Sequence, residues 1–384
     1  MNAPIVFFID PQSYNNLSIY DYGVLQNVSN VNIYYFGNKL YDYKPINATK
    51  KSLIYNYSKK RHIFKVISYL SSLSFLFIQI LRIRPKIIHV QWIRLFSIEY
   101  PIYYIAKRIF GCRLVFTVHN ILPRRKKKNT VKQYQKLYNL FDTLIAHTET
   151  TKDNLITQFN IFANKIHIIP HGLLSLNSEE DKINTIKTEF INKYKLKGKI
   201  IFSHLGTQSK YKGSDLLIEA WLNDKRLSNR DDIALVIAGK FNNLNPPSTP
   251  SKNMIVIPRI LNNDEFKVFL SLTDVMLMPY REIDQSGMLL TLISEEIPFC
   301  VSNAGELSRP LDFANIGWKF DNISDKAISD KILDIINNPI SIRNKKNNKV
   351  GWNKLKSLYD WEKISQKTSL LYHSLINDTV TKCE

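Results

Sequence analysis

Cysteine and glycine are scarce in this chain, and so are acidic side chains relative to basic ones. Its 384 residues include 3 cysteines and 12 glycines. Cys112, Cys300 and Cys383 are odd in number and far apart, which argues against a disulfide framework and against a zinc site. We therefore expect a protein of the reducing cytoplasm. The first ten residues lack a basic segment and a small-residue cleavage site, so we expect a buried strand there rather than a signal peptide.

Acidic residues are scarcest in the first half. Residues 1–175 hold 24 Lys and Arg against 7 Asp and Glu, so +17 of the net charge of +20 lies there. The electrostatic field of such a concentration of positive charge attracts an anionic membrane surface or a polyanion. We predict no nucleic-acid partner, because the sequence has no zinc finger, RNP-like aromatic motif or obvious helix-turn-helix. We expect a peripheral protein on the inner face of the membrane.

The chain also lacks the run of about 20 apolar residues that a membrane-spanning helix requires. Its longest uncharged stretch, residues 66–81 (VISYLSSLSFLFIQIL), contains four serines and a glutamine. We interpret this stretch as too short and too polar to span a membrane. Two alternatives stay open for the helix over residues 62–81: a buried helix of the first domain, or a helix lying in the membrane interface.

Short apolar runs alternate with helix-length segments along the whole chain. This alternation predicts an α/β protein with parallel sheets covered by helices on both faces, once per half. Residues 174–190 are polar and charged, and we expect a linker there. Residues 361–376 have an amphipathic helical pattern. The predicted strands are Ile5–Ile9, Ile87–Val90, Leu114–Val118, Thr143–Ala146, Lys165–Ile169, Lys199–Ser203, Ala234–Ala238, Met254–Ile257, Val275–Met278 and Phe299–Ser302.

Two strand-to-helix turns in the second half carry groups that bind anions. Gly206 and Gly213 bracket the first turn (LGTQSKYKG), and Lys210 and Lys212 stand beside the opening of the next helix. Glycine lets the backbone approach a ligand closely, and free N–H groups beside lysines form an anion site. An ordinary structural turn is the open alternative.

The second turn, residues 279–290 (PYREIDQSGMLL), opens an apolar helix. Ser286 and Gly287 occupy the expected N-cap and first turn. The free N–H groups there can donate hydrogen bonds to a second side of a diphosphate. Glu282 and Asp284 precede them as acceptors for sugar hydroxyls. In the alternative, Ser286 only caps the helix and Asp284 complements its dipole.

A run of five adjacent cations follows the strand Leu114–Val118. Like charges this close must stay solvated, so we expect a surface loop. Loops after parallel strands lie at the ligand-binding edge of the sheet, so we expect this loop to face the acceptor or the membrane that carries it. A merely soluble face is the alternative. The five residues are Arg124, Arg125, Lys126, Lys127 and Lys128.

Taken in order, seven segments resemble the retaining glycosyltransferases of the GT-B fold, in the GT4-like group (glycosyltransferase family 4, group 1). In the first half they are LVFTVHNILP (114–123), AHTETTKDNL (146–155) and IIPHG (168–172). In the second half they are GTQSKYKG followed by DLLIEAW, LVIAGK (235–240), MPYREIDQSGMLL and CVSNAGEL (300–307). The ordered series is more specific than any single motif.

The resemblance implies two Rossmann-like domains that face each other across a cleft. Residues 1–175 would bind the acceptor and residues 176–355 the nucleotide-sugar donor, while residues 356–384 would form a C-terminal helix that crosses back to the first domain. The implied catalytic residues are His119, which faces the transferred sugar, Asp284, which contacts sugar hydroxyls, and Lys212, which holds the diphosphate. The implied donor-binding set is Gly206, Thr207, Lys210, Lys212, Glu282, Gln285, Ser286, Gly287, Met288 and, near the hinge, Gly172.

The sequence departs from the family pattern in three places. Thr207 and Ser209 stand where the family has an arginine before the lysine, and Lys210 is the substitute cation. Leu292 replaces the second glutamate, which commonly binds the ribose. Residues 11–21 (PQSYNNLSIYD) replace the first domain's glycine-rich loop, so no acceptor contact is assigned there.

We expect sugar transfer from a nucleotide-diphosphate donor to a saccharide or lipid-linked saccharide in surface-glycan synthesis, with retention of configuration. No Asp-x-Asp triplet is present to hold a metal on the diphosphate, so we expect no cofactor and no metal, with lysines and helix amides in its place. Two alternatives stay open: a nucleotide-sugar 2-epimerase on the same fold, and a non-catalytic relative that binds membrane or glycan.

Overall fold

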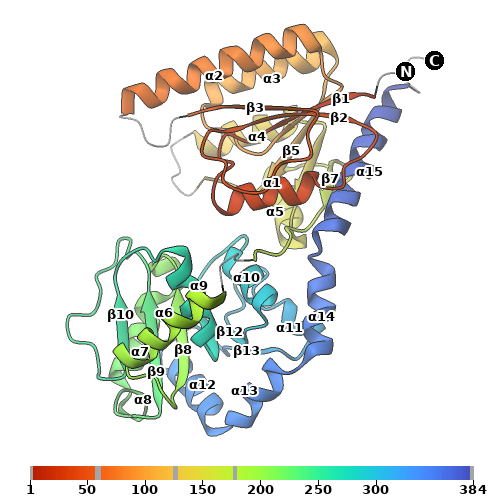
Figure 1. Cartoon of the computed structure of the whole chain (residues 1–384). Coiled ribbons are helices and arrows are strands. Elements are labelled where there is room, and N and C mark those ends of the chain that lie inside the picture. The colour runs from red at the N-terminus through yellow and green to blue at the C-terminus, as the bar shows by residue number, and fades with distance from the viewer. Residues whose placement is uncertain (1–2, 57–61, 124–128, 176–179, 381–384) are drawn as a thin grey trace. The chain divides into compact units, whose positions relative to one another are not determined.

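The chain forms two compact units, each built around a parallel sheet (Figure 1). The structure is a computed structural model that describes residues 3–56, 62–123, 129–175 and 180–380. Unit 1 comprises Met1–Gly172 and Tyr359–Glu384, and unit 2 comprises Leu173–Leu358. The predicted fold class, two α/β domains with parallel sheets, is confirmed.

Unit 1 contains a seven-stranded sheet in the order β3-β2-β1-β4-β5-β6-β7, in which every pair is parallel. Its strands are β1 (Ile5–Ile9), β2 (Asn32–Asn38), β3 (Lys50–Tyr55), β4 (Ile87–Val90), β5 (Arg113–Val118), β6 (Thr143–Ala146) and β7 (Ile166–Ile168). Its helices are α1 (Asn16–Leu25), α2 (His62–Ile83), α3 (Phe96–Phe110), α4 (Thr130–Leu140), α5 (Glu149–Phe159) and α15 (Trp361–Val380).

The strand β1 shows how the sequence covers both faces of this sheet. Side chains alternate across a strand, so Phe7 and Ile9 join one core with α2, α3, α4 and α5. Val6 and Phe8 join the other core, which α1 and α15 complete. A parallel sheet requires apolar cover on both faces, and α15, from the far end of the chain, supplies part of it.

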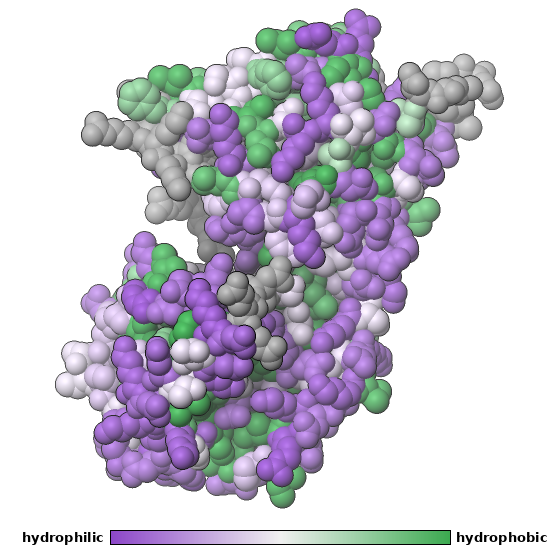
Figure 2. All heavy atoms as spheres, viewed as in Figure 1, coloured by the Kyte–Doolittle hydropathy of each residue, from purple (hydrophilic) through white to green (hydrophobic). Residues whose placement is uncertain are grey.

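Helix α2 has two apolar faces. Its inner face belongs to the core through Tyr69, Leu73, Leu76 and Ile80. Its outer face exposes large apolar side chains, among them Ile67 (59%) and Ile78 (49%), and Figure 2 shows hydrophobic residues gathered where α2 and α3 lie. Among the described residues, the stretch Phe64–Ile83 is the one helix long and apolar enough to cross a membrane by length and composition. The helix is therefore part of the core and also presents an uncovered apolar face.

Unit 2 contains a six-stranded parallel sheet in the order β10-β9-β8-β11-β12-β13. Its strands are β8 (Ile200–Leu205), β9 (Ile233–Ala238), β10 (Met254–Ile257), β11 (Val275–Met278), β12 (Phe299–Val301) and β13 (Gly317–Lys319). Its α-helices are α6 (Glu180–Lys193), α7 (Ser214–Asn223), α8 (Lys225–Ser228), α9 (Asn263–Leu272), α10 (Gly287–Glu295), α11 (Pro310–Phe313), α12 (Asp325–Asn337), α13 (Pro339–Lys346) and α14 (Lys349–Leu358).

The linker expected over residues 174–190 is wrong for the described part of that stretch. Helix α6 begins at Glu180, buries Ile183 and packs on α9, with the Phe190 ring centroid 4.8 Å from that of Phe269. Ile183 and Phe190 stand seven residues apart, a helical spacing that the surrounding charged residues obscured. The strands β2, β3 and β13 were also not predicted.

Helix α15 is fixed to unit 1 at its first residue, Trp361. The indole ring of Trp361 contacts Gly23 of α1 and Gly172, the last residue of unit 1 before the chain enters unit 2. A Cβ atom on either glycine would lie 2.2 Å from indole ring atoms, so both positions exclude any larger residue. Farther along, the Ser365 hydroxyl accepts a hydrogen bond of 2.9 Å from the Asn27 amide.

Replacing Gly172 with alanine is expected to loosen α15. The added methyl group overpacks the indole and costs about 1–3 kcal/mol of stability. The cost should shrink in a Trp361→Leu background, because the smaller side chain leaves room for the methyl group. Hydrogen exchange across residues 361–377 in a double-mutant cycle measures this coupling. Additive effects of the two substitutions would contradict the packing contact.

Candidate functional site

The carboxyl ends of β8 and β11 form the place in unit 2 where a ligand is expected. These strands are neighbours, with Phe202 beside Val275 and Ser203 beside Met276. The chain leaves β8 toward one side of the sheet and β11 toward the other, since β9 and β12 lie on opposite sides of this pair. At such a reversal the two following loops lie side by side and leave a crevice. The two predicted anion-binding turns are these two loops.

An ion pair that the sequence analysis missed ties the two loops together. The guanidinium group of Arg281 donates to both carboxylate oxygens of Asp215, at 2.7 and 2.9 Å, and also to the carbonyl of Lys210. The Arg281 amide donates to the carbonyl of Tyr211 at 2.8 Å. Gly213, at φ +67°, completes the junction, because a Cβ there would lie 2.0 Å from the carbonyl oxygen of Pro279. These contacts therefore hold the two loops together.

The first turn of α7 is already occupied by Asp215. Burial alone would raise the pKa of this carboxyl, but hydrogen bonds and charge from Arg281, with the amides of Leu216 and Asp215 itself, lower it below its usual value. An ionised carboxylate at a helix N-terminus takes the position that an anionic ligand would take. The first turn of α10, in contrast, contains no acidic side chain.

Lys212 reaches the side of the crevice where α10 opens. A Cβ atom at Gly206, whose φ is +98°, would lie 3.6 Å from Nζ of Lys212 and 3.9 Å from Cε of Met288. The same ammonium group lies 5.4 Å from the ring centroid of Tyr280, which is buried after β11. Lys212, Gly206 and the first turn of α10 are thus on the same side of unit 2.

The opening of α10 is capped as predicted. The hydroxyl of Ser286 accepts a hydrogen bond from the Leu289 amide at 3.3 Å. The amides of Gly287 and Met288 come first in the helix and have no carbonyl of the preceding turn to bind. Leu292, where the family has a ribose-binding glutamate, is fully buried in the helix and forms part of the core.

The other predicted donor residues line the same two loops. Thr207, Lys210, Glu282 and Gly287 are exposed, while Asp284, Gln285 and Met288 are half-buried. Beneath them lies His204, a residue that the sequence analysis did not single out. Its Nδ1 bonds the carbonyl of Leu277 at 2.7 Å and its Nε2 bonds the hydroxyl of Ser214 at 2.9 Å. Burial, with a smaller contribution from the Lys212 charge, lowers the pKa of His204 to about 4, so it supports the loops as a neutral side chain.

In unit 1, His119 ends β5 inside a group of aromatic and polar side chains. Its ring stacks on Trp92 at 4.7 Å between centroids and meets Tyr20 edge-on at 4.9 Å. Its Nε2 is hydrogen-bonded to the amide group of Gln91 at 3.0 Å, and its Nδ1 to Nε2 of His147 at 3.4 Å. Burial and the neighbouring histidines lower the pKa of His119 well below its usual value, so the ring is neutral at physiological pH.

Two buried carboxyl groups stand where the family's glycine-rich loop would be. Asp10 follows β1 and accepts the Gln12 amide at 2.6 Å, and its charge acts on Asp21 of α1. The Tyr35 hydroxyl donates to Asp21 at 2.7 Å. Burial raises the pKa of Asp10 to about 7, and burial with the neighbouring Asp10 charge raises that of Asp21 well above its usual value. Both carboxyl groups therefore keep their protons to a higher pH than an exposed aspartate does, and we expect the pair to share a proton.

Two further groups were predicted as site residues, Gly172 and the basic run. Gly172 lies in unit 1, where it packs on Trp361. The basic run Arg124, Arg125, Lys126, Lys127 and Lys128 falls outside the described residues. Within the described part of the chain, no three His, Cys, Asp or Glu side chains are grouped as metal ligands would be.

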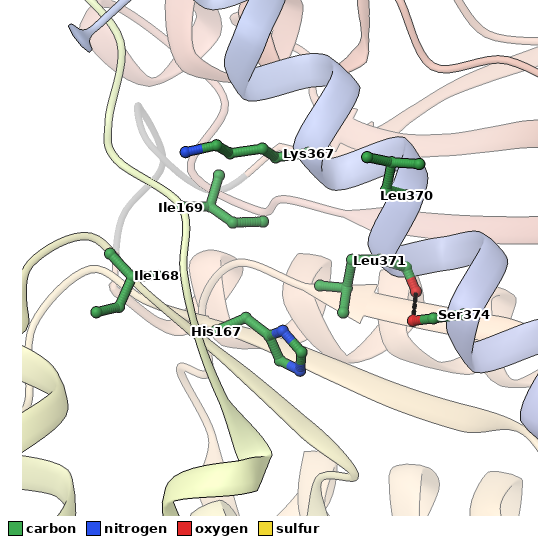
Figure 3. A pocket seen from close by; sticks show the side chains of 7 residues that line it. All are labelled: His167, Ile168, Ile169, Lys367, Leu370, Leu371 and Ser374. Carbon is green, nitrogen blue, oxygen red and sulfur yellow. Dashed lines mark hydrogen bonds between the residues drawn. The ribbon is translucent and has the colours of Figure 1, made fainter.

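Two hollows lie at different places among the described residues of unit 1. One, of about 390 Å³, lies between the segment that follows β4 and helix α4, and Arg94, Phe96, Ile98 and Tyr134 help to line it. The other, of about 340 Å³, lies where Lys367 and Leu371 of α15 meet His167 of the edge strand β7 (Figure 3). The first hollow borders the carboxyl edge of the sheet, where parallel sheets bind ligands. The second borders the edge strand β7 and the residue that follows it, Ile169.

Comparison with known proteins agrees with this fold. Residues 41–173 match the family described as Glycosyltransferase Family 4. The fold is similar to that of sucrose-phosphate synthase from Thermosynechococcus elongatus, at 13% identity over 98% of this chain and 99% of that chain, with a TM-score of 0.70. It is also similar to HepE from Anabaena, solved with UDP-glucose, at 12% identity over 97% and 100%, with a TM-score of 0.68.

A putative UDP-N-acetylglucosamine 2-epimerase from Listeria monocytogenes shares the fold as well, at 12% identity over 90% of this chain and 91% of that chain, with a TM-score of 0.55. No curated protein sequence matches the chain significantly.

The carboxyl pair predicts that stability falls as pH rises. Because the folded pKa of Asp10 lies above its unfolded value of 3.8, the folded state holds more protons, and its stability declines between about pH 4 and about pH 7. Asp21→Asn should flatten this decline, since the amide can keep the hydrogen bonds but cannot ionise. Thermal unfolding from pH 4 to pH 8 measures it. Asp231→Asn, at an exposed ion pair with Lys252, is the control, and an unchanged slope in Asp21→Asn would refute the shared proton.

Proposed function

We propose that this protein, a glycosyltransferase of the GT-B fold whose residues 41–173 match family 4, transfers a sugar from a nucleoside-diphosphate donor to a saccharide or lipid-linked saccharide acceptor. The transfer retains the anomeric configuration and serves the synthesis of a surface polysaccharide or glycan. The observation that carries the proposal is the position of Lys212, beside Gly206 and the first turn of α10.

This arrangement suits a departing diphosphate. The bond between the anomeric carbon and the phosphate oxygen breaks, and the sugar acquires oxocarbenium character while charge grows on the leaving group. A fixed ammonium group and free amides at a helix N-terminus stabilise that charge without reorganising. The acceptor hydroxyl forms the new bond, and its proton passes to the leaving phosphate. We propose that Lys212 and α10 perform the task that a metal performs in other transferases.

Polar side chains at the crevice support recognition of the donor sugar. Asp284 and Glu282 precede the α10 opening, and their carboxylates can accept hydrogen bonds from sugar hydroxyls. HepE was solved with UDP-glucose, so a uridine diphosphate donor is the first to test. Leu292 cannot bind a ribose, so ribose recognition falls to another group in the two loops.

Replacing Lys212 with alanine tests the donor site. Loss of a cation at the leaving group should lower transfer by about 10²-fold or more and weaken binding of the nucleoside diphosphate. Lys197→Ala is the matched control, because Lys197 is exposed in the turn before β8, at the opposite end of that strand. Calorimetry with UDP and product analysis with and without acceptor are the measurements.

The outcomes of that experiment separate the candidate functions. Near-normal transfer by the Lys212 variant overturns the assignment of this lysine. Conversion of the donor sugar without acceptor identifies an epimerase instead. Failure of the wild-type protein to bind any nucleoside diphosphate identifies a non-catalytic relative.

We further propose that unit 1 binds an anionic membrane surface and takes its acceptor there. Three observations support this proposal: the excess of positive charge in residues 1–175, the exposed apolar face of α2, and exposed apolar residues of α3 such as Ile109 (69%). Apolar side chains beside cations are what a peripheral protein inserts into an interface. The hollow near Arg94 combines one cation with apolar walls, which suits a phosphate attached to a lipid.

Sedimentation with vesicles tests the membrane proposal. The wild-type protein should bind vesicles that contain phosphatidylglycerol at low salt and bind them less at high salt. Ile67→Glu with Ile78→Glu should reduce binding about tenfold or more, because two charges would enter the interface. Val350→Glu, at an even more exposed apolar residue of unit 2, should leave binding unchanged. Absence of wild-type binding at every salt concentration refutes the proposal.

A further inference from the structure

A continuous series of hydrogen bonds links His119 to the C-terminal helix. Tyr372 of α15 bonds Nδ1 of His89 at 2.6 Å, and Nε2 of His89 bonds the Gln91 amide group at 3.0 Å. Gln91 bonds Nε2 of His119 at 3.0 Å, and Nδ1 of His119 bonds Nε2 of His147 at 3.4 Å. These residues come from the ends of three neighbouring strands and from α15, which is distant from them in sequence.

The end of the series at His147 fixes the direction of every bond in it. Nδ1 of His147 bonds the carbonyl of Ile169 at 2.9 Å, and a carbonyl only accepts, so Nδ1 carries the proton. In a neutral ring, Nε2 of His147 is then bare and must accept. Nδ1 of His119 must therefore donate, which leaves Nε2 of His119 bare in its own neutral form.

The amide of Gln91 decides whether the series can stay neutral. The structure places its Oε1 toward His119 and its Nε2 toward His89, and rotation of the amide by half a turn exchanges the two. With its oxygen toward His119, Nε2 of His119 would have to donate, and two bare nitrogens, or one extra proton, would stand between His119 and His147. With its nitrogen toward His119, Gln91 donates to Nε2 of His119, and its oxygen accepts from Nε2 of His89. Nδ1 of His89 then accepts from the Tyr372 hydroxyl. Nε2 of His89 also lies 2.8 Å from the Thr117 hydroxyl, whose oxygen can accept from the same N–H. With Gln91 in this orientation every ring nitrogen has a partner and no charge is needed.

The surroundings disfavour the extra proton. The ring of His119 lies between Trp92 and Tyr20, and the buried rings of His89, His147 and His171 approach it from β4, β6 and the segment after β7. Burial lowers the pKa of His147 to about 4 and those of His89 and His171 to about 3. Asp10 and Asp21, the carboxyl groups whose charges act on Tyr20, keep their protons to a higher pH than an exposed aspartate does. A charge shared by His119 and His147 would have no ionised partner in contact.

We propose that Gln91 and Tyr372 are positioning residues, which hold His119 as the neutral tautomer protonated at Nδ1. The effect passes from Tyr372 through His89 and Gln91, so docking of α15 completes the site in unit 1. The inference rests on the proposed function, in which His119 faces the transferred sugar. With both ring nitrogens engaged, His119 presents a fixed, neutral surface to the sugar and neither takes nor releases a proton during transfer.

Nitrogen NMR of the full-length protein reads the tautomers without any substrate. Long-range proton–nitrogen spectra with labelled histidine should show protonation at Nδ1 for His119 and His147 and at Nε2 for His89. Single replacement of each of these three histidines assigns the signals. A charged ring at His119 or His147 at pH 7.5, or protonation of His119 at Nε2, overturns the proposal.

Two variants should change this pattern, and one matched variant should not. Gln91→Glu supplies only acceptors, so His119 should become protonated at Nε2 as well. Tyr372→Phe removes the donor to His89, which should then show a mixture of tautomers. Ser365→Ala removes a different hydroxyl of α15, which bonds the Asn27 amide, and should leave all three rings as in the wild type. An unchanged spectrum in Gln91→Glu overturns the proposal.

Kinetics of the same variants test whether the tautomer matters for transfer. Gln91→Glu and Tyr372→Phe should lower kcat about tenfold with little change in KM for the donor, while Ser365→Ala stays within about twofold. Normal kcat in a variant whose His119 spectrum has changed overturns the positioning role. Absence of transfer by the wild-type protein with every donor refutes the proposed function instead, and the spectra then still decide whether the neutral series exists.

Discussion

The pairing of β8 with β11 is the constraint on which the donor site depends. These strands are about 70 residues apart in the chain, yet Phe202 lies beside Val275 in the sheet. Because the chain turns to opposite sides after the two strands, no crossover covers their carboxyl ends, and the following loops meet there. The ion pair between Arg281 and Asp215 then holds the loops together. Lys212 and the opening of α10 share one side of unit 2 as a consequence.

Unit 1, in contrast, buries polar side chains at the carboxyl edge of its sheet. His89, Gln91 and Thr117 are fully buried, and so are Asp10 and Asp21. Removing such groups from water is unfavourable unless each finds a partner. Tyr372 supplies one of these partners from the last helix of the chain. The core of unit 1 and its site are therefore built from the same contacts, which explains why α15 returns to this unit.

The sequence predicted the central strands well because they are buried on both faces and are continuously apolar. It missed β3 and β13, which lie at sheet edges, and β2 (NIYYFGN), whose polar ends hide a buried middle. It also took the beginning of α6 for a linker, because charged residues separate its apolar positions. In the site, spacing indicated Lys212 and Ser286, but nothing in the local sequence marked Arg281 as the partner of Asp215.

The sequence by itself determined the fold class, the helix cap at Ser286 and the concentration of positive charge in the first half. These properties depend on the identity and local order of residues, which the chain carries whether folded or not. Only the tertiary structure decided that Arg281 pairs with Asp215, that Asp10 and Asp21 are buried, and that Tyr372 reaches His89. Each of these depends on a distance between residues that are far apart in the chain or on opposite sides of a loop. A partner at hydrogen-bond distance, or the removal of water by burial, exists only once the sheets have formed.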